Sequence, residues 1–177
     1  MKKSVKYRIQ GYHMPEYIID VLTGGYTDTF LPMSIFKERD SYIFLYDKGN
    51  LQKLNVDIMN RIQKINLIKT LIDIYEKNNN FLIPGRAYKL DTSMIYYFNE
   101  KDDYKKMRIM YYPDLKGVSF YEKLTDLVKD IFHVKDGLEE NTAKIMIDAI
   151  ESKDMNRLRR YIDKKIIQSW EEIILVV

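Results

Sequence analysis

The sequence predicts an α+β fold, with a small N-terminal antiparallel sheet followed by a helical C-terminal part that carries a β-hairpin. Three observations support this fold class. Apolar residues from Ile58 to Tyr75 recur at steps of three and four residues, which is the spacing of one helix face. Runs rich in aromatic and β-branched residues flank charged loops before and after this helix, which is typical of hairpins. Beyond Pro113 the apolar spacing is again helical.

The length of the chain limits its domain organisation. At 177 residues it is one ordinary domain, or two small parts that share an interface. The turn-forming sequence Asp47–Asn50 marks the predicted boundary. We therefore expect residues 1–50 to form the sheet part and residues 51–177 to form the helical part with its hairpin, in one compact unit.

Composition excludes several classes of protein. The chain has no cysteine, so disulfide bonds and thiolate metal sites are excluded and a reducing compartment fits. Its net charge of +3 is mild and differs from the strong basicity of a dedicated nucleic-acid binder. The basic N-terminus lacks the apolar core of a signal peptide, and no apolar run approaches the roughly 20 residues of a membrane helix. We expect a cytoplasmic protein without a transmembrane segment.

The first 50 residues contain the strands of the predicted sheet. Val5–Ile9 alternates apolar and polar side chains, which is the period of a half-buried strand. Pro15–Leu22, followed by two glycines, predicts a short helix, although its β-branched residues leave a strand as the alternative. The apolar runs Phe30–Phe36 and Tyr42–Tyr46 flank a charged loop and predict a hairpin.

The central helix predicted over 58–75 leads into a second hairpin. Its polar residues, Lys64 among them, mostly lie opposite the apolar stripe. The run Asn78–Asn80 is expected to stop the helix, because asparagine tolerates the left-handed conformation and competes for backbone hydrogen bonds. Ser93–Phe98 and Met107–Tyr112 then predict two strands joined by a charged loop.

Helix start and stop signals follow the second hairpin. Ser119 and Glu122 have the spacing of a capping box at the start of a helix over 120–132. Gly137 is expected to break the helical pattern.

Two further helices are predicted near the end of the sequence. One opens at Asn141 or Thr142, and Asp154 is placed to cap the other. The apolar face of this last helix contains Leu158, Tyr161, Ile162 and Ile166.

This order of elements resembles a known family. A small sheet, a hairpin ending in Phe44–Asp47, a buried helix, the apolar segment Phe81–Pro84, a β-ribbon and then helices together resemble a reduced protein-kinase fold. More closely, the chain resembles the degenerate kinase-like domain of bacterial type VII secretion proteins of the EssB/YukC type. It also resembles a related uncharacterised clostridial domain that often precedes a phosphopeptide-binding FHA module. The pairs Leu31–Pro32 and Tyr46–Asp47, and the sequence Tyr111–Pro113, carry this resemblance.

The resemblance, over about residues 5–165, implies a pseudokinase. The glycines of the N-terminal part do not have the spacing of a phosphate-binding loop. The expected catalytic-loop position near Pro84–Arg86 has no His-Arg-Asp, and Asp91 has no base motif before it. At the expected metal-binding position, Asp114 is not followed by Phe-Gly. We therefore expect no enzymatic activity and no cofactor.

Other catalytic motifs are also missing from the sequence. His13 and His133 are the only histidines, neither lies in HExxH, and each is interpreted as structural. The adjacent carboxylates of Asp102–Asp103 and Glu139–Glu140 are interpreted as solvated loop and helix-start charges, and no G-x-S-x-G occurs. No metal site is predicted.

A basic surface is the first of two candidate binding features. Arg157, Arg160 and Lys164 share one helix face by their three- and four-residue spacing. Such a stripe suits phosphates, an anionic membrane surface or a protein partner. The alternative is an ordinary solvated helix face, since Asp154 and Asp163 interleave with the cations.

An aromatic ribbon is the second candidate. Tyr97 and Tyr111 represent a set of tyrosines near basic residues, a combination that can stack nucleic-acid bases on a sheet. The alternative is a core position, because alternate residues of a strand must face inward. The set contains Tyr96, Tyr97, Tyr104, Tyr111 and Tyr112, near Lys105, Lys106 and Arg108.

Taken together, these features predict a non-catalytic protein-interaction or scaffold domain of pseudokinase type. Its partner is an unidentified protein, and the sequence leaves self-association open. The alternative is a small nucleic-acid-binding protein that uses the basic C-terminal helix. A third class is an enzyme whose site is too dispersed to leave a motif.

Overall fold

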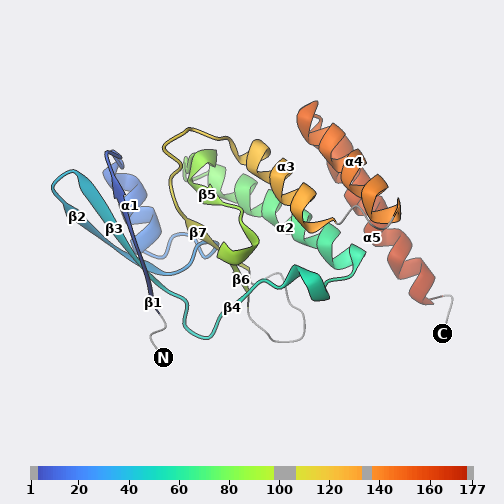
Figure 1. Ribbon diagram of the computed structural model, residues 1–177, viewed down its shortest axis with the longest axis horizontal. Helices are drawn as coiled ribbons and strands as arrows, with labels where there is room; N and C mark the ends of the chain where they lie inside the picture. The colour runs from blue at the N-terminus through green and yellow to red at the C-terminus, as the bar shows by residue number, and fades with distance from the viewer. Residues whose placement is uncertain (1–3, 98–106, 133–136, 175–177) are drawn as a thin grey trace. The chain divides into compact units, whose positions relative to one another are not determined.

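The computed structural model describes residues 4–97, 107–132 and 137–174, and confirms the α+β class (Figure 1). The described chain divides into two compact units. The sheet unit comprises Met1–Leu54 and Tyr75–Val118, and the helical unit comprises Asn55–Ile74 and Ser119–Val177. The division predicted after residue 50, within one compact unit, is therefore replaced by one that groups the second hairpin with the N-terminal sheet.

The N-terminal sheet has three antiparallel strands in the order β1-β3-β2. They are β1 (Ser4–Gln10), β2 (Met33–Glu38) and β3 (Ser41–Asp47), with Tyr7 and Ile35 both opposite Phe44. The hairpin prediction is confirmed, although β2 begins three residues later than the apolar run. The segment after Pro15 is a helix, α1 (Glu16–Thr23), and not the alternative strand.

The second sheet has the strand order β4-β6-β7-β5. Its strands are β4 (Gln52–Lys53), β5 (Tyr88–Lys89), β6 (Ile95–Tyr97) and β7 (Arg108–Tyr111). Ile109 of β7 donates its N–H to the carbonyl of Thr29 at 2.9 Å and accepts the N–H of Leu31 at 3.0 Å. These bonds to a segment far away in the sequence explain why the hairpin belongs to the sheet unit.

Aromatic rings fill the core of the sheet unit. Phe30 packs against Tyr88 and Tyr111 with ring centroids 5.4 and 5.6 Å away. Phe44 stacks on Tyr46, and the Tyr46 hydroxyl donates a hydrogen bond to the carbonyl of Tyr111. All five rings are buried. Removal from water raises the pKa of Tyr46, Tyr88 and Tyr111 above the usual range, because burial penalises the phenolate.

Helix α2 (Arg61–Asn79) runs through both units, with Tyr75 as its first residue in the sheet unit. It begins after the short 3₁₀ turn η1 (Val56–Ile58), so Ile58 is 72% exposed and not part of the buried stripe as predicted. Lys64, expected on the polar side, is buried, because its ammonium pairs with Glu139. Two further 3₁₀ turns, η2 (Gly85–Ala87) and η3 (Thr92–Met94), follow α2.

The helical unit adds three helices to the first part of α2: α3 (Phe120–Ile131), α4 (Gly137–Glu151) and α5 (Met155–Ile174). The capping box of Ser119 and Glu122 is confirmed, with both of its reciprocal hydrogen bonds formed. Helix α4 begins at Gly137, four residues before Asn141, so the predicted break and start were wrong. Helices α3 and α5 both contact α4.

Four predictions concern residues outside the described ranges. They are the end of the predicted strand at Phe98, the charged hairpin loop over 99–106 with Tyr104, Lys105 and Lys106, the carboxylate pair Asp102–Asp103, and His133. Within the described part of the chain, no helix combines the length and apolar character needed to cross a bilayer.

Candidate binding surface on helix α5

Helix α5 is capped at its start and buries one side of its first three turns. The carboxylate Oδ1 of Asp154 accepts the backbone N–H of Arg157 at 2.8 Å, which confirms the predicted cap. Leu158 and Ile162 are 0% and 1% exposed, as expected from their spacing on the apolar face. Helices α4 and α5 lie side by side (Figure 1). The cap and the buried stripe therefore fix which side of α5 faces solvent.

Some charges of α5 hold the helical unit together. Arg159 contacts Asp73 of α2 at 2.9 Å, and Asp163 accepts a hydrogen bond from Lys69 of α2 at 2.8 Å. All four side chains retain at least 28% exposure, so each pair contributes modestly to stability, about 0.2–1 kcal/mol. The predicted alternative, a solvated face of interleaved charges, therefore describes part of this helix.

The three cations singled out from the sequence are all exposed. Arg157, Arg160 and Lys164 lie on one face of α5, as their spacing predicts. A surface groove of about 480 Å³ runs along this face. It is lined by Arg160, Asp163, Lys164, Ile167, Gln168 and Glu171, which we call the α5 face.

The sequence interpretation missed the apolar part of this surface. Ile167, which lines the groove, is 57% exposed, and Trp170, which is not among the lining residues, is 61% exposed. The lining positions follow Arg160 at intervals of three, four, seven, eight and eleven residues, which is the spacing of a helix face that packs against another element. The signal was present, since the spacing of the cations continues to Ile167 and Glu171, but the interpretation of this face considered only its cations.

The aromatic contact surface is not formed as predicted. Tyr111 is 0% exposed and Tyr97 is 8% exposed, so neither ring is available to stack a nucleic-acid base. Tyr111 instead meets the rings of Phe30 and Phe44 in the core of the sheet unit. The core alternative holds for both residues, because successive residues of β6 and β7 are buried, so both faces of these strands are covered.

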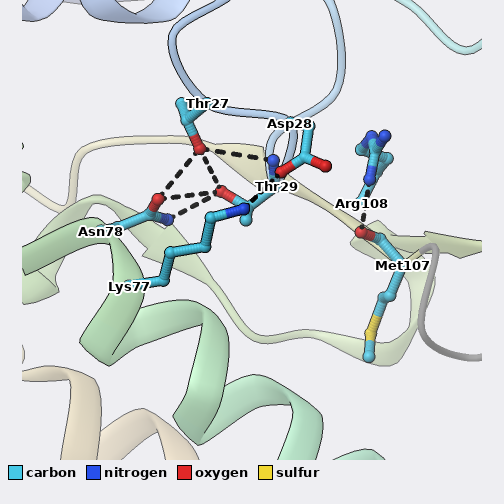
Figure 2. A network of polar contacts seen from close by, with 7 residues as sticks. All are labelled: Thr27, Asp28, Thr29, Lys77, Asn78, Met107 and Arg108. Carbon is cyan, nitrogen blue, oxygen red and sulfur yellow. Dashed lines mark hydrogen bonds and ion pairs between the residues drawn. The ribbon is translucent and has the colours of Figure 1, made fainter.

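A buried polar network in the sheet unit was also missed (Figure 2). Asn78, expected only to stop α2, is 0% exposed. Its Oδ1 accepts the hydroxyls of Thr27 and Thr29 at 2.9 and 3.1 Å, and its Nδ2 lies 2.8 Å from Thr29 Oγ1. Lys77 pairs with Asp28 at 2.9 Å beside it. These bonds tie the segment before β2 to the end of α2, which is a structural role.

A second groove, of about 340 Å³, lies on the N-terminal sheet. Phe36 and Leu45 are 52% and 37% exposed there. The ion pair between Arg8 and Glu38 joins the two edge strands. This groove is smaller than the one on α5.

The carboxylates nearest the expected catalytic positions serve local turns. Asp91 Oδ1 accepts the N–H of Ser93 at 2.8 Å, and hydrogen bonds from Ser93 hold the pKa of Asp91 below its usual range. Asp114 Oδ1 accepts the N–H of Lys116 at 2.7 Å. Among the residues that the structure describes, no three His, Cys, Asp or Glu side chains gather as metal ligands.

No protein-family model matches this chain, and no curated protein matches it significantly.

Proposed function

We propose that this chain is a non-catalytic protein-interaction or scaffold domain of pseudokinase type. The α5 face is the observation that carries the proposal. It combines the exposed apolar side chain of Ile167 with the cations Arg160 and Lys164, at the spacing of a helix face that packs against another element. Trp170, next to Glu171 in the sequence, is also exposed. Exposed aromatic residues and arginine beside an apolar centre are typical of protein interfaces. Docking therefore accounts for side chains that a solvated helix would not need to expose.

Two further features support the pseudokinase part of this proposal. The elements follow the order that the resemblance implies: sheet, hairpin ending in Asp47, helix α2, the ribbon of β6 and β7, then helices. Asp91 and Asp114, the carboxylates closest to the expected catalytic and metal positions, are both engaged in turns. A phosphate-transfer site requires such groups to point toward nucleotide and metal instead.

Site-specific photo-crosslinking tests the docking role. A photoreactive phenylalanine analogue replaces Lys164 on the α5 face, and as a matched control replaces Lys144, an exposed lysine of α4. In cells that express the chain naturally, we expect a discrete protein adduct from position 164 and none from position 144. Equal labelling from both positions, or none from either, would contradict the proposal.

A thermal-shift measurement with ATP and magnesium tests the absence of catalysis. We expect the melting temperature to stay unchanged, because a ligand raises it only by binding the folded state. A concentration-dependent rise, or transfer of phosphate to any substrate, would contradict the pseudokinase assignment.

Nucleic-acid binding is the second candidate, favoured by the common exposure of Arg157, Arg160 and Lys164. Fluorescence anisotropy with labelled single-stranded DNA and RNA at physiological ionic strength tests it. Binding that weakens with salt, and is lost in Arg157→Ala/Arg160→Ala, would support this candidate over docking. Unchanged anisotropy would exclude it.

A further inference from the structure

Unpaired charge changes along the α5 face. Arg160 and Lys164 occupy its N-terminal part, beside Asp163, whose carboxylate pairs with Lys69. Ile167 lies in its middle and Glu171 at its C-terminal end. From Arg160 to Glu171 the stripe is about 16 Å long at the rise of an α-helix. Two copies of a stripe that runs from basic through apolar to acidic are complementary when they lie antiparallel, because the basic end of each then faces the acidic end of the other.

We infer that the α5 face pairs with the α5 face of a second copy of this chain, with the two helices antiparallel. This inference rests on the proposed docking role of the same surface. A two-fold dimer interface must be self-complementary, because the same patch serves on both subunits. An antiparallel pairing meets this condition here, since it brings the basic part of each helix against the acidic part of the other.

The helix register fixes which residues meet. Placing Arg160 opposite Glu171 of the second copy also places Lys164 opposite Ile167 of the second copy, because both pairs share one midpoint along the helix. The two-fold axis repeats each contact. Arginine and glutamate then form an ion pair at each end, and the methylene stem of lysine covers the exposed isoleucine.

The acidic groups on this face disfavour the other occupants. Glu171 and Asp163 line the same groove as Arg160 and Lys164. Carboxylates there repel the phosphates of a nucleic acid or of an anionic lipid surface. A second copy uses Glu171 as a partner for Arg160, and Asp163 is already paired with Lys69.

Charge reversal tests the pairing, with mass measured by light scattering and by analytical ultracentrifugation from micromolar to millimolar concentration. Arg160→Glu and Glu171→Arg each place like charges opposite one another at both ends. We expect each variant to raise the dimer dissociation constant by about tenfold or more. Lys144→Glu, the same reversal on α4, should leave it unchanged.

Variants that restore opposite charges at positions 160 and 171 show whether the loss of the dimer is due to this pair. The double variant Arg160→Glu/Glu171→Arg again places opposite charges together, so its dimer should return. The two single variants, mixed, should form a heterodimer that neither forms alone, since one chain is acidic and the other basic at both positions. Trp170, the only tryptophan of the chain, lies beside Glu171 and reports pairing by a blue shift of its emission.

Three outcomes would overturn the inference: a monomer throughout the concentration range, a dimer unaffected by both single reversals, or no recovery in the double variant and in the mixture. Circular dichroism of each variant shows whether it is folded. The crosslinks from position 164 separate this failure from that of the proposed function. If the chain is monomeric but crosslinks to a different protein, only the self-pairing inference is refuted. If it forms neither an adduct nor a dimer, the self-pairing and the proposed docking role are both refuted.

Discussion

The Nζ atom of Lys64 lies 2.9 Å from Oε1 and 3.0 Å from Oε2 of Glu139. This ion pair joins α2 to α4 inside the helical unit, where the two side chains are 6% and 14% exposed. The ammonium group also lies 5.8 Å from the ring centroid of Phe132. Both contacts compensate Lys64 for the loss of water around its charge.

Replacing Lys64 by methionine should destabilise the helical unit. Lys64→Met keeps most of the volume but leaves the Glu139 carboxylate without its ammonium partner in a mostly buried position. We expect a loss of about 2–4 kcal/mol in the free energy of unfolding, since Glu139 retains some exposure at the start of α4. Urea unfolding followed by circular dichroism measures it.

A double replacement separates the ion pair from packing. In Lys64→Met/Glu139→Leu no buried charge remains, so we expect most of the stability to return. Lys129→Met, at an exposed position of α3, is the control and should change the free energy of unfolding by less than about 0.5 kcal/mol. A double variant no more stable than Lys64→Met would contradict this account.

The buried hydrogen bonds of Asn78 should contribute more to stability than the neighbouring residue Asn79 does (Figure 2). Asn78→Ala removes the partner of two threonine hydroxyls that stay buried or half-buried. We expect the free energy of unfolding to fall by about 2–3 kcal/mol. Asn79→Ala, at the exposed last residue of α2, should have little effect. Equal losses for both variants would show that only the helix end matters.

Amide hydrogen exchange locates the effect of Asn78→Ala. We expect faster exchange at Leu31 and Ile109, because their N–H groups close the bonds between the Thr27–Leu31 segment and β7. Unchanged protection at these two amides would contradict a role for Asn78 in holding that segment.

Local signals in the sequence were sufficient for most elements of the fold. The spacing of Ser119 and Glu122 predicted a capping box, and Asp154 predicted the start of α5, because a cap needs only residues within one turn. The start of α4 was missed because glycine usually interrupts a helix, and because Lys64, the ion-pair partner of Glu139, lies 75 residues away in the sequence. The grouping of the second hairpin with the N-terminal sheet was missed because it also depends on contacts between residues far apart in the sequence, such as Ile109 with Thr29 and Leu31.

The candidate surface was only half predictable. The spacing of Arg157, Arg160 and Lys164 identified the exposed side of α5 correctly. Periodicity alone does not say whether Ile167 and Trp170 are covered, because apolar residues usually face a core. Tyr97 and Tyr111 show the opposite case, since they were candidates for a contact surface and are buried. Aromatic residues in a strand are compatible with either location.

Loss of the Ser119 cap should destabilise α3 by a predictable amount. Ser119→Ala removes the hydroxyl that accepts the N–H of Glu122, although the Glu122 carboxylate can still accept the N–H of residue 119. We expect a loss of about 1 kcal/mol in the free energy of unfolding, measured by urea titration. Ser119→Asp, which preserves a cap acceptor, should restore most of it, and failure to do so would argue against capping as the cause.

Alkaline pH should unfold the sheet unit through its buried tyrosines. Tyr46, Tyr88 and Tyr111 are 0% exposed, and burial raises the pKa of each above its unfolded value. Their contribution to stability is therefore complete below the unfolded pKa near 10 and is lost as the pH rises toward the folded values. Above pH 10 the unfolded state binds fewer protons, so stability should fall by about 4 kcal/mol per pH unit for three such groups.

Absorbance at 295 nm, which reports tyrosinate, measures this titration beside circular dichroism. A cooperative rise in absorbance should coincide with loss of the circular dichroism signal. In Tyr111→Phe one fewer proton is released in that rise, whereas Tyr26→Phe, at a position that is 67% exposed, is the control. Ionisation of every tyrosine in a single step near pH 10, with the fold intact, would show that these three side chains are not held away from water.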